Sequence, residues 1–184
     1  MTTQKGTATE LGTLPIRKLL MQYSIPAIIA MTAASLYNMI DSIYIGQGVG
    51  ALAISGLALT FPLMNLAAAF GSLVGVGAAT LISVRLGQKD YDTAKDILGN
   101  VVLLNLIIGL AFGFITLIFL DPILYFFGAS EATIGYARDF MRVILLGNVI
   151  THMYLGLNSV LRAAGHPKKA MMATINTVLF NVVL

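Results

Sequence analysis

The chain has 184 residues and a formal net charge of +3; 58% of its residues are hydrophobic and only 10% are charged. Soluble domains are roughly 45–50% apolar and about 25% charged, so a soluble fold of this length could not bury so much apolar surface. The small net charge gives no indication of a nucleic-acid partner, and a chain without cysteine and with two histidines is poorly suited to a zinc cluster. The composition predicts an integral membrane protein.

Five apolar segments follow a polar tail over residues 1–16, in which we expect no cleavable signal peptide. We expect helices over about 19–45, 51–84, 97–120, 134–161 and 170–184. The first four reach the roughly 20 residues that a membrane-spanning helix needs, whereas the fifth is too short for a bilayer core about 30 Å thick. These lengths predict an all-α membrane bundle over 17–184 and suggest a chain that is part of a longer protein.

The basic residues favour one orientation of this bundle. Nine of the eleven Lys and Arg residues lie before the first segment, between the second and third, or between the fourth and fifth. The positive-inside rule places these connections and the N-terminus in the cytoplasm, with the bundle in the plasma (inner) membrane. Arg138 and Arg142 are the exceptions, for which snorkelling towards the outer interface is the simple explanation.

Asp41 is the most informative polar residue because it is the only carboxylate well inside an expected span. A charge at the centre of a span costs about 2.5–3.5 kcal/mol or more, so such residues usually face a bundle interior or a wet cavity. At about 100° per residue, one half of this helix gathers its polar and small side chains: Ala30, Ala34, Tyr37, Asn38, Asp41, Ser42 and Tyr44. An Asp41 solvated at the outer interface is the alternative.

The fourth and fifth segments also carry polar faces. The same construction places one group of polar side chains on one arc of the fourth segment: Asn148, Thr151, His152, Tyr154, Asn158, Ser159 and Arg162. In the fifth, Thr174, Thr177 and Asn181 share a face. Together these faces predict an aqueous chamber lined by Asn38, Tyr44, Asn148, Thr151, His152, Tyr154 and Thr177. Each residue alone also fits a contact between helices, and His152 fits a structural residue better than a proton relay.

No catalytic constellation is present, because neither a nucleophile–base pair nor a phosphate loop can be assembled from these motifs. We therefore expect no enzyme activity and no cofactor. Pro26 and Pro62 lie inside the first two helices and should bend them. Two G-x-x-x-G spacings permit close helix contact: Gly71 with Gly75, and Gly109 with Gly113.

Three runs of the sequence stand out together: Ser24–Pro26 followed by Leu36–Asp41, Gly71–Thr80 leading to Arg85–Asp90, and Asn158–Pro167. They resemble, in this order, the first helix, the second helix with the loop after it, and the end of the fourth helix of transporters of the multidrug and toxic compound extrusion (MATE) family. The resemblance covers nearly all of residues 17–184, and it is the combination of runs that is specific.

The resemblance implies a 12-helix antiporter of two six-helix lobes, of which this chain would form most of the N-terminal lobe beside a C-terminal lobe. Members of the family export cationic or amphipathic organic compounds against H⁺ or Na⁺, and their lobes rock to give alternating access. A nucleic-acid partner is not expected.

The resemblance also implies roles for single residues. Asp41 matches the acid that binds the coupling cation, H⁺ or Na⁺, and Pro26 matches a proline at which the helix bends. Tyr37, Asn158 and Asn181 match polar neighbours of that acid. Leu155 departs from the pattern, because relatives can carry a polar residue there. Two other functions stay open: a flippase for lipid-linked oligosaccharides from the same superfamily, and a non-transporting membrane assembly protein.

Overall fold

The structure of the chain, a computed structural model, describes residues 14–183, without the side chains of Asp41 and residues 181–183. Within this range the chain forms helices and no strand: α1 (Ile16–Gly48), α2 (Ala51–Gly87), α3 (Tyr91–Ile118), α4 (Leu120–Phe126), α5 (Ile134–Leu146), α6 (Asn148–Ala163) and α7 (Pro167–Val183). Most of the expected polar tail, residues 1–13, lies outside the described part of the chain.

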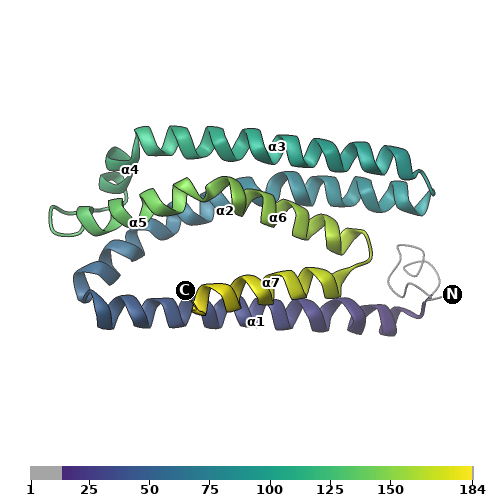
Figure 1. Ribbon diagram of the computed structural model, residues 1–184, viewed down its shortest axis with the longest axis horizontal. Helices are drawn as coiled ribbons and strands as arrows, with labels where there is room; N and C mark the ends of the chain where they lie inside the picture. Colours follow the sequence, from purple (N-terminus) through teal and green to yellow (C-terminus); the bar gives the residue numbers. More distant parts are fainter. Residues whose placement is uncertain (1–13, 184) are drawn as a thin grey trace.

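The helices lie roughly along one direction (Figure 1). α1 and α7 run side by side along one edge, α3 forms the opposite edge, and α2 and α6 lie between these edges. Among the described residues, α1, α2 and α3 are long and apolar enough to cross a membrane, and α5 with α6 makes a fourth candidate if this bent pair is one span. The prediction of an all-α membrane bundle is confirmed.

Local sequence explains where the connections fall. Gly50 and Gly165 adopt φ values of 106° and 83°, a region that disfavours side chains with a Cβ, and they separate α1 from α2 and α6 from α7. Pro167 then begins α7, where its missing N–H costs nothing. The Asp90 carboxylate accepts a hydrogen bond from the Thr93 N–H at 3.2 Å and caps α3. This cap explains why α3 begins at Tyr91, earlier than the expected boundary near residue 97.

The structure corrects the prediction of a single helix over residues 134–161. The structure divides it into α5 and α6, which meet at an angle of 57° around Gly147. Glycine is a poor helix former, and here it ends α5 with its N–H 3.3 Å from the Val143 carbonyl oxygen. The next residue, Asn148, donates its side-chain amide to the Gly109 carbonyl oxygen of α3 at 3.0 Å. Hydrophobic periodicity cannot reveal such an anchor because the partner comes from another helix.

The close contacts predicted from the glycine spacings are present. A Cβ added to Gly75 would lie 2.5 Å from the Cα of Gly156, so α2 and α6 approach backbone to backbone there. A Cβ on Gly109 would lie 3.2 Å from the Cα of Val149, which brings α3 against the same helix. Small residues therefore let three helices share one tight junction.

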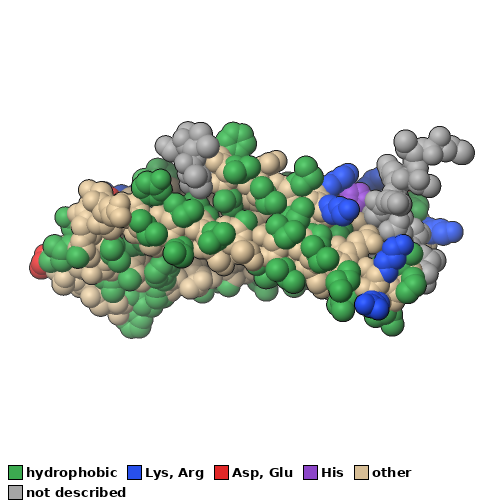
Figure 2. Space-filling view, turned by 90° about the horizontal axis from the view of Figure 1, so that it is seen from below, with side chains coloured by type: hydrophobic (Ala, Val, Ile, Leu, Met, Phe, Trp, Pro, Cys, Tyr) green, Lys and Arg blue, Asp and Glu red, His purple; other side chains and the backbone are tan. Residues whose placement is uncertain are grey.

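Apolar clusters occupy both sides of this junction. One joins α2, α4 and α5 through Leu63, Leu120, Leu124, Ile134, Ala137, Met141 and Leu145. The other joins α2, α3 and α6 through Ala78, Ile82, Val101 and Val160. Large apolar side chains also remain exposed along the sides of the helices, for example Phe114 at 69% and Leu110 at 57%. Hydrophobic side chains spread along the length of the face in Figure 2, while charges gather at its ends, as expected for a surface that meets lipid.

Candidate functional site

The expected coupling acid, Asp41, belongs to the C-terminal half of α1, but its side chain lies outside the described residues. Two of its polar neighbours, Asn38 and Ser42, form hydrogen bonds within the same helix. The Asn38 amide donates to the Ala34 carbonyl oxygen at 3.0 Å, and the Ser42 hydroxyl donates to the Asn38 carbonyl oxygen at 2.9 Å. Asn38 is exposed and Tyr44 is 70% exposed. This part of α1 therefore presents polar groups on an open surface.

Pro26 lies on the side of α1 that faces the bundle. It is buried, as is Ala30 one turn later, while Tyr37 further along is half-buried. The helix continues through Pro26 from Ile16 to Gly48 although proline has no N–H to donate to the preceding turn. Pro26 is thus a point of weakened backbone hydrogen bonding inside a long helix.

α7 brings the second expected partner, Asn181, to the same side of the molecule. The two helices run in the same direction, and the C-terminal end of α7 lies alongside the second half of α1 (Figure 1). Thr177, four residues before Asn181, is exposed and donates its hydroxyl to the Ala173 carbonyl oxygen at 2.9 Å. The Asn181 side chain lies outside the described residues, so its approach to Asp41 stays a prediction.

A row of hydrogen bonds, which we call the α6–α7 ladder, connects these two helices. Tyr154 donates its hydroxyl to Thr174 Oγ1 at 2.6 Å, and Thr174 donates to the Ala170 carbonyl oxygen at 3.1 Å. The Asn158 amide donates to the same Ala170 oxygen at 3.1 Å, while its Oδ1 accepts from Arg162 Nε at 2.9 Å. Both polar atoms of the Asn158 side chain are therefore engaged.

Asn158 bonds to the start of α7, whereas Asn181 belongs to the C-terminal end of that helix. Asn158 contacts Ala170, eleven residues before Asn181, which corresponds to about 16 Å along an α-helix. Asn158 thereby joins the start of α7 to the end of α6. The resemblance groups Asn158 and Asn181 around one cation, and that shared role stays a prediction.

Two residues expected to line a chamber are buried in the lobe. Asn148 and His152 are 2% and 0% exposed, and both lie at the junction of α2, α3 and α6. His152 Nδ1 lies 2.9 Å from the Asn148 carbonyl oxygen, and since that oxygen can only accept, Nδ1 carries the proton. These residues hold helices together and do not line an open surface here. Thr151, by contrast, is exposed.

Asn105 is a buried polar residue that sequence reasoning missed. It lies on α3, is 0% exposed, and donates to the Val101 carbonyl oxygen at 3.0 Å. A Cβ added to Gly156 would collide with the Asn105 amide. Asn105 Oδ1 and His152 Nε2 have no hydrogen-bond partner among the described residues. The signal in the sequence was an asparagine four residues before Gly109, within the apolar run that follows Asn100.

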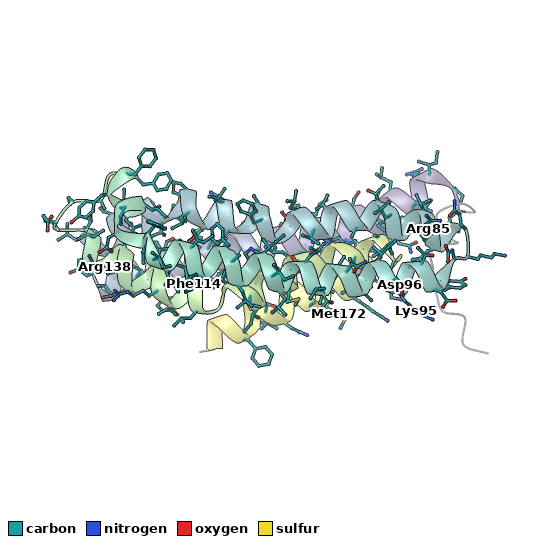
Figure 3. The ribbon with its side chains drawn as sticks, turned by 90° about the horizontal axis from the view of Figure 1, so that it is seen from above. Arg85, Lys95, Asp96, Phe114, Arg138 and Met172 are labelled. Carbon is teal, nitrogen blue, oxygen red and sulfur yellow. The ribbon has the colours of Figure 1, made fainter. Side chains whose placement is uncertain are left out.

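The two ends of the bundle carry ion pairs. At one end, Arg138 binds Asp121 through two hydrogen bonds of 2.7 Å, which lower the pKa of that carboxyl. The sequence had suggested only snorkelling for Arg138. At the other end, Arg85 lies 3.6 Å from Asp90, and hydrogen bonds from Thr93 lower the Asp90 pKa. Figure 3 shows Arg138 at the end opposite to Arg85.

The described residues contain no group of three or more His, Cys, Asp or Glu side chains that could hold a metal ion. The uncharged polar side chains of α1, α6 and α7 lie at helix junctions or on the surface of these helices. Such an arrangement suits a helical lobe with an open polar side.

The MatE family model matches residues 26–184. The chain belongs to the MatE family. It is 31% identical over 169 residues to the multidrug export protein MepA of Staphylococcus haemolyticus, a match that covers 92% of this chain and 37% of MepA. The relatives to which this chain is similar in sequence are named as export proteins. The chain is a multi-pass membrane protein of a bacterial transporter family.

Solved structures of MatE transporters share the fold. A crystal structure of MATE in the straight conformation is 28% identical and has a TM-score of 0.88; the match covers 100% of this chain and 40% of that one. The multidrug transporter DinF-BH in complex with R6G is 34% identical with a TM-score of 0.88, and the match covers 99% and 40%. The chain therefore spans about two fifths of the length of the transporters that it matches.

Proposed function

We propose that this MatE chain is the N-terminal lobe of a secondary active multidrug exporter in the plasma membrane. The exporter would carry cationic or amphipathic organic compounds in exchange for H⁺ or Na⁺. The observation that carries the proposal is the match of residues 26–184 to the MatE family together with the shared fold of a multidrug transporter that binds R6G. A second lobe would complete the pathway, because the match covers 40% of that transporter. The basic connections favour a cytoplasmic N-terminus.

In this proposal Asp41 is the coupling carboxylate, and Asn181, Asn158 and Tyr37 are its polar neighbours. The open polar surface around Asn38 and Tyr44 supports a water-accessible position for the acid. Ionised Asp41 would favour the conformation that captures the cation, and neutralised Asp41 would favour the other, since a ligand shifts an equilibrium only by its different affinity for the two states. Pro26 would be the point at which α1 deforms.

The test is Asp41→Asn in the protein at its full natural length, reconstituted in proteoliposomes with an imposed H⁺ or Na⁺ gradient. We expect gradient-driven export of a fluorescent organic cation to fall to the level of empty liposomes. The asparagine amide cannot switch between an ionised and a neutral form as the carboxylate can. The matched control is Asp92→Asn, whose carboxylate is 95% exposed beside Lys95 and should not affect export.

Retained gradient-driven export in the Asp41→Asn variant would overturn the coupling role. Export that is absent from the unmodified protein under both gradients would favour a flippase or an assembly protein, and transfer of a lipid-linked oligosaccharide across the liposome membrane would separate these two.

A further inference from the structure

The basic residues at the α1 N-terminal end of the bundle are unevenly neutralised. In the connection between α2 and α3, Arg85, Lys89 and Lys95 share residues 85–96 with as many carboxylates: Asp90, Asp92 and Asp96. Arg85 lies 3.6 Å from Asp90, and Lys95 lies 3.1 Å from Asp92. Figure 3 shows Arg85, Lys95 and Asp96 together at this end. On this side of the end of the bundle, the positive charges are matched by an equal number of nearby acids.

On the other side of this end of the bundle, the described residues include no such acids. Residues 162–169, which cover the end of α6, the turn after it and the start of α7, contain Arg162, Lys168 and Lys169 and no carboxylate. The start of α1, which lies beside the start of α7, adds Arg17 and Lys18. None of these five cations forms an ion pair within the part of the chain that the structure describes. Figure 2 shows Lys and Arg side chains gathered around a histidine at this end of the α1–α7 face. We call these five residues the basic rim.

One residue of the basic rim, Arg162, is held in place by hydrogen bonds. Arg162 donates from Nε and Nη2 to the buried Asn158 side chain, which orients the guanidinium and leaves Nη1 outside that contact. The turn behind it is tied down as well, because Ser83 of α2 donates to the Ala163 carbonyl oxygen at 3.2 Å. An oriented guanidinium beside two lysines can bind the oxygens of a phosphate without first losing side-chain freedom.

We propose that the basic rim binds the phosphate of an anionic phospholipid headgroup in the leaflet on the side of the α1 N-terminus. The rim lies at the end of the bundle where the candidate span α1 begins and α6 ends, which is the level at which headgroups reside, and its charge complements theirs. The positive-inside rule requires Lys and Arg in both of these connections, but it does not require that one of them lack acids. The orientation of the protein in the membrane therefore does not explain why residues 162–169 carry no carboxylate while residues 85–96 carry three.

The test compares two triple variants of the protein at its full natural length. The first is Arg162→Gln/Lys168→Gln/Lys169→Gln, and the matched control is Arg85→Gln/Lys89→Gln/Lys95→Gln from the connection between α2 and α3. Native mass spectrometry measures how many phosphatidylglycerol and phosphatidylcholine molecules each protein retains from mixed micelles. We expect the first variant to lose phosphatidylglycerol affinity by about fivefold for each removed charge, and the control to retain it.

Equal losses in both variants would overturn the proposal in favour of a general positive field, and no loss in either would overturn it outright. Competition by millimolar inorganic phosphate would show a site for small anions and would also contradict the lipid assignment. Should the first triple variant unfold at a lower temperature in phosphatidylcholine, the double variant Lys168→Gln/Lys169→Gln, which keeps the contact between Arg162 and Asn158, decides the question by the same measurement. None of these readouts depends on transport.

Discussion

Single glycines set the distance between α2 and α6 in this lobe. On α2, a side chain at Gly71 would meet Leu155 and His152 of α6, and one at Gly75 would meet the Gly156 backbone of α6. Gly77, two residues after Gly75, faces open space, with nothing within 4 Å of a Cβ placed there. Glycines of one helix therefore have different roles that depend on which side of α2 they occupy.

This difference predicts opposite outcomes for one substitution. Gly75→Ala should destabilise the lobe by about 1–3 kcal/mol, because the Gly156 backbone cannot move aside as a flexible side chain could. Gly77→Ala should be neutral or stabilise by up to about 1 kcal/mol, since alanine is the better helix former and meets nothing. Thermal unfolding of both variants in detergent measures this. Equal stability of the two variants would contradict the close approach of α2 and α6.

At the scale of helices, the α6–α7 ladder determines how α7 begins. The turn between the two helices spans only a few residues, and Asn158 crosses it to reach the Ala170 carbonyl oxygen. The same side chain orients Arg162. One buried amide thus connects the end of α6, the start of α7 and the largest local concentration of positive charge.

Asn158→Ala should therefore loosen the start of α7. Loss of hydrogen bonds to a buried carbonyl and to a guanidinium costs about 1–3 kcal/mol, and we expect faster amide hydrogen exchange over residues 163–174. Ser159→Ala is the matched control, because Ser159 donates only within its own helix, to Leu155 at 3.0 Å. Hydrogen-exchange mass spectrometry in nanodiscs compares the two. Unchanged exchange at the start of α7 in Asn158→Ala would show that the ladder contributes little.

At the scale of the whole molecule, the described helices divide into two groups. α2, α3, α4, α5 and α6 meet at the glycine junction or in the two apolar clusters, whereas α1 packs chiefly along α7 (Figure 1). Among described side chains, α1 buries Pro26 and Ala30, while α2 buries ten residues. The helix proposed to carry the coupling acid is thus the one least restrained by the rest of the lobe.

We expect this division to appear in local stability. Amides in the C-terminal half of α1 should exchange at opening free energies well below the global value, and amides around the Gly75–Gly156 contact should exchange only on global unfolding. Hydrogen exchange across a denaturant series in nanodiscs makes the comparison. Uniform protection of α1 and α2 would mean that other parts of the protein hold α1 as firmly as the core.

The sequence by itself determined the class of the protein and most of the helices. Apolar length predicted the spans, because a bilayer requires about 20 residues of continuous apolar helix whatever their partners. The glycine spacings correctly indicated close contacts, and three short runs indicated the MATE resemblance that the MatE match confirms. These features are local, so they can be read without knowledge of neighbouring helices.

Only the tertiary structure decided what the polar residues do. Asn148, His152 and Asn158 share one arc of a helix with Thr151, yet three of them are buried and Thr151 is exposed. The bend at Gly147 and the pairing of Arg138 with Asp121 were also hidden in the sequence. The physical reason is the same in each case: a polar side chain takes its role from the donor or acceptor that faces it, and that partner belongs to another helix.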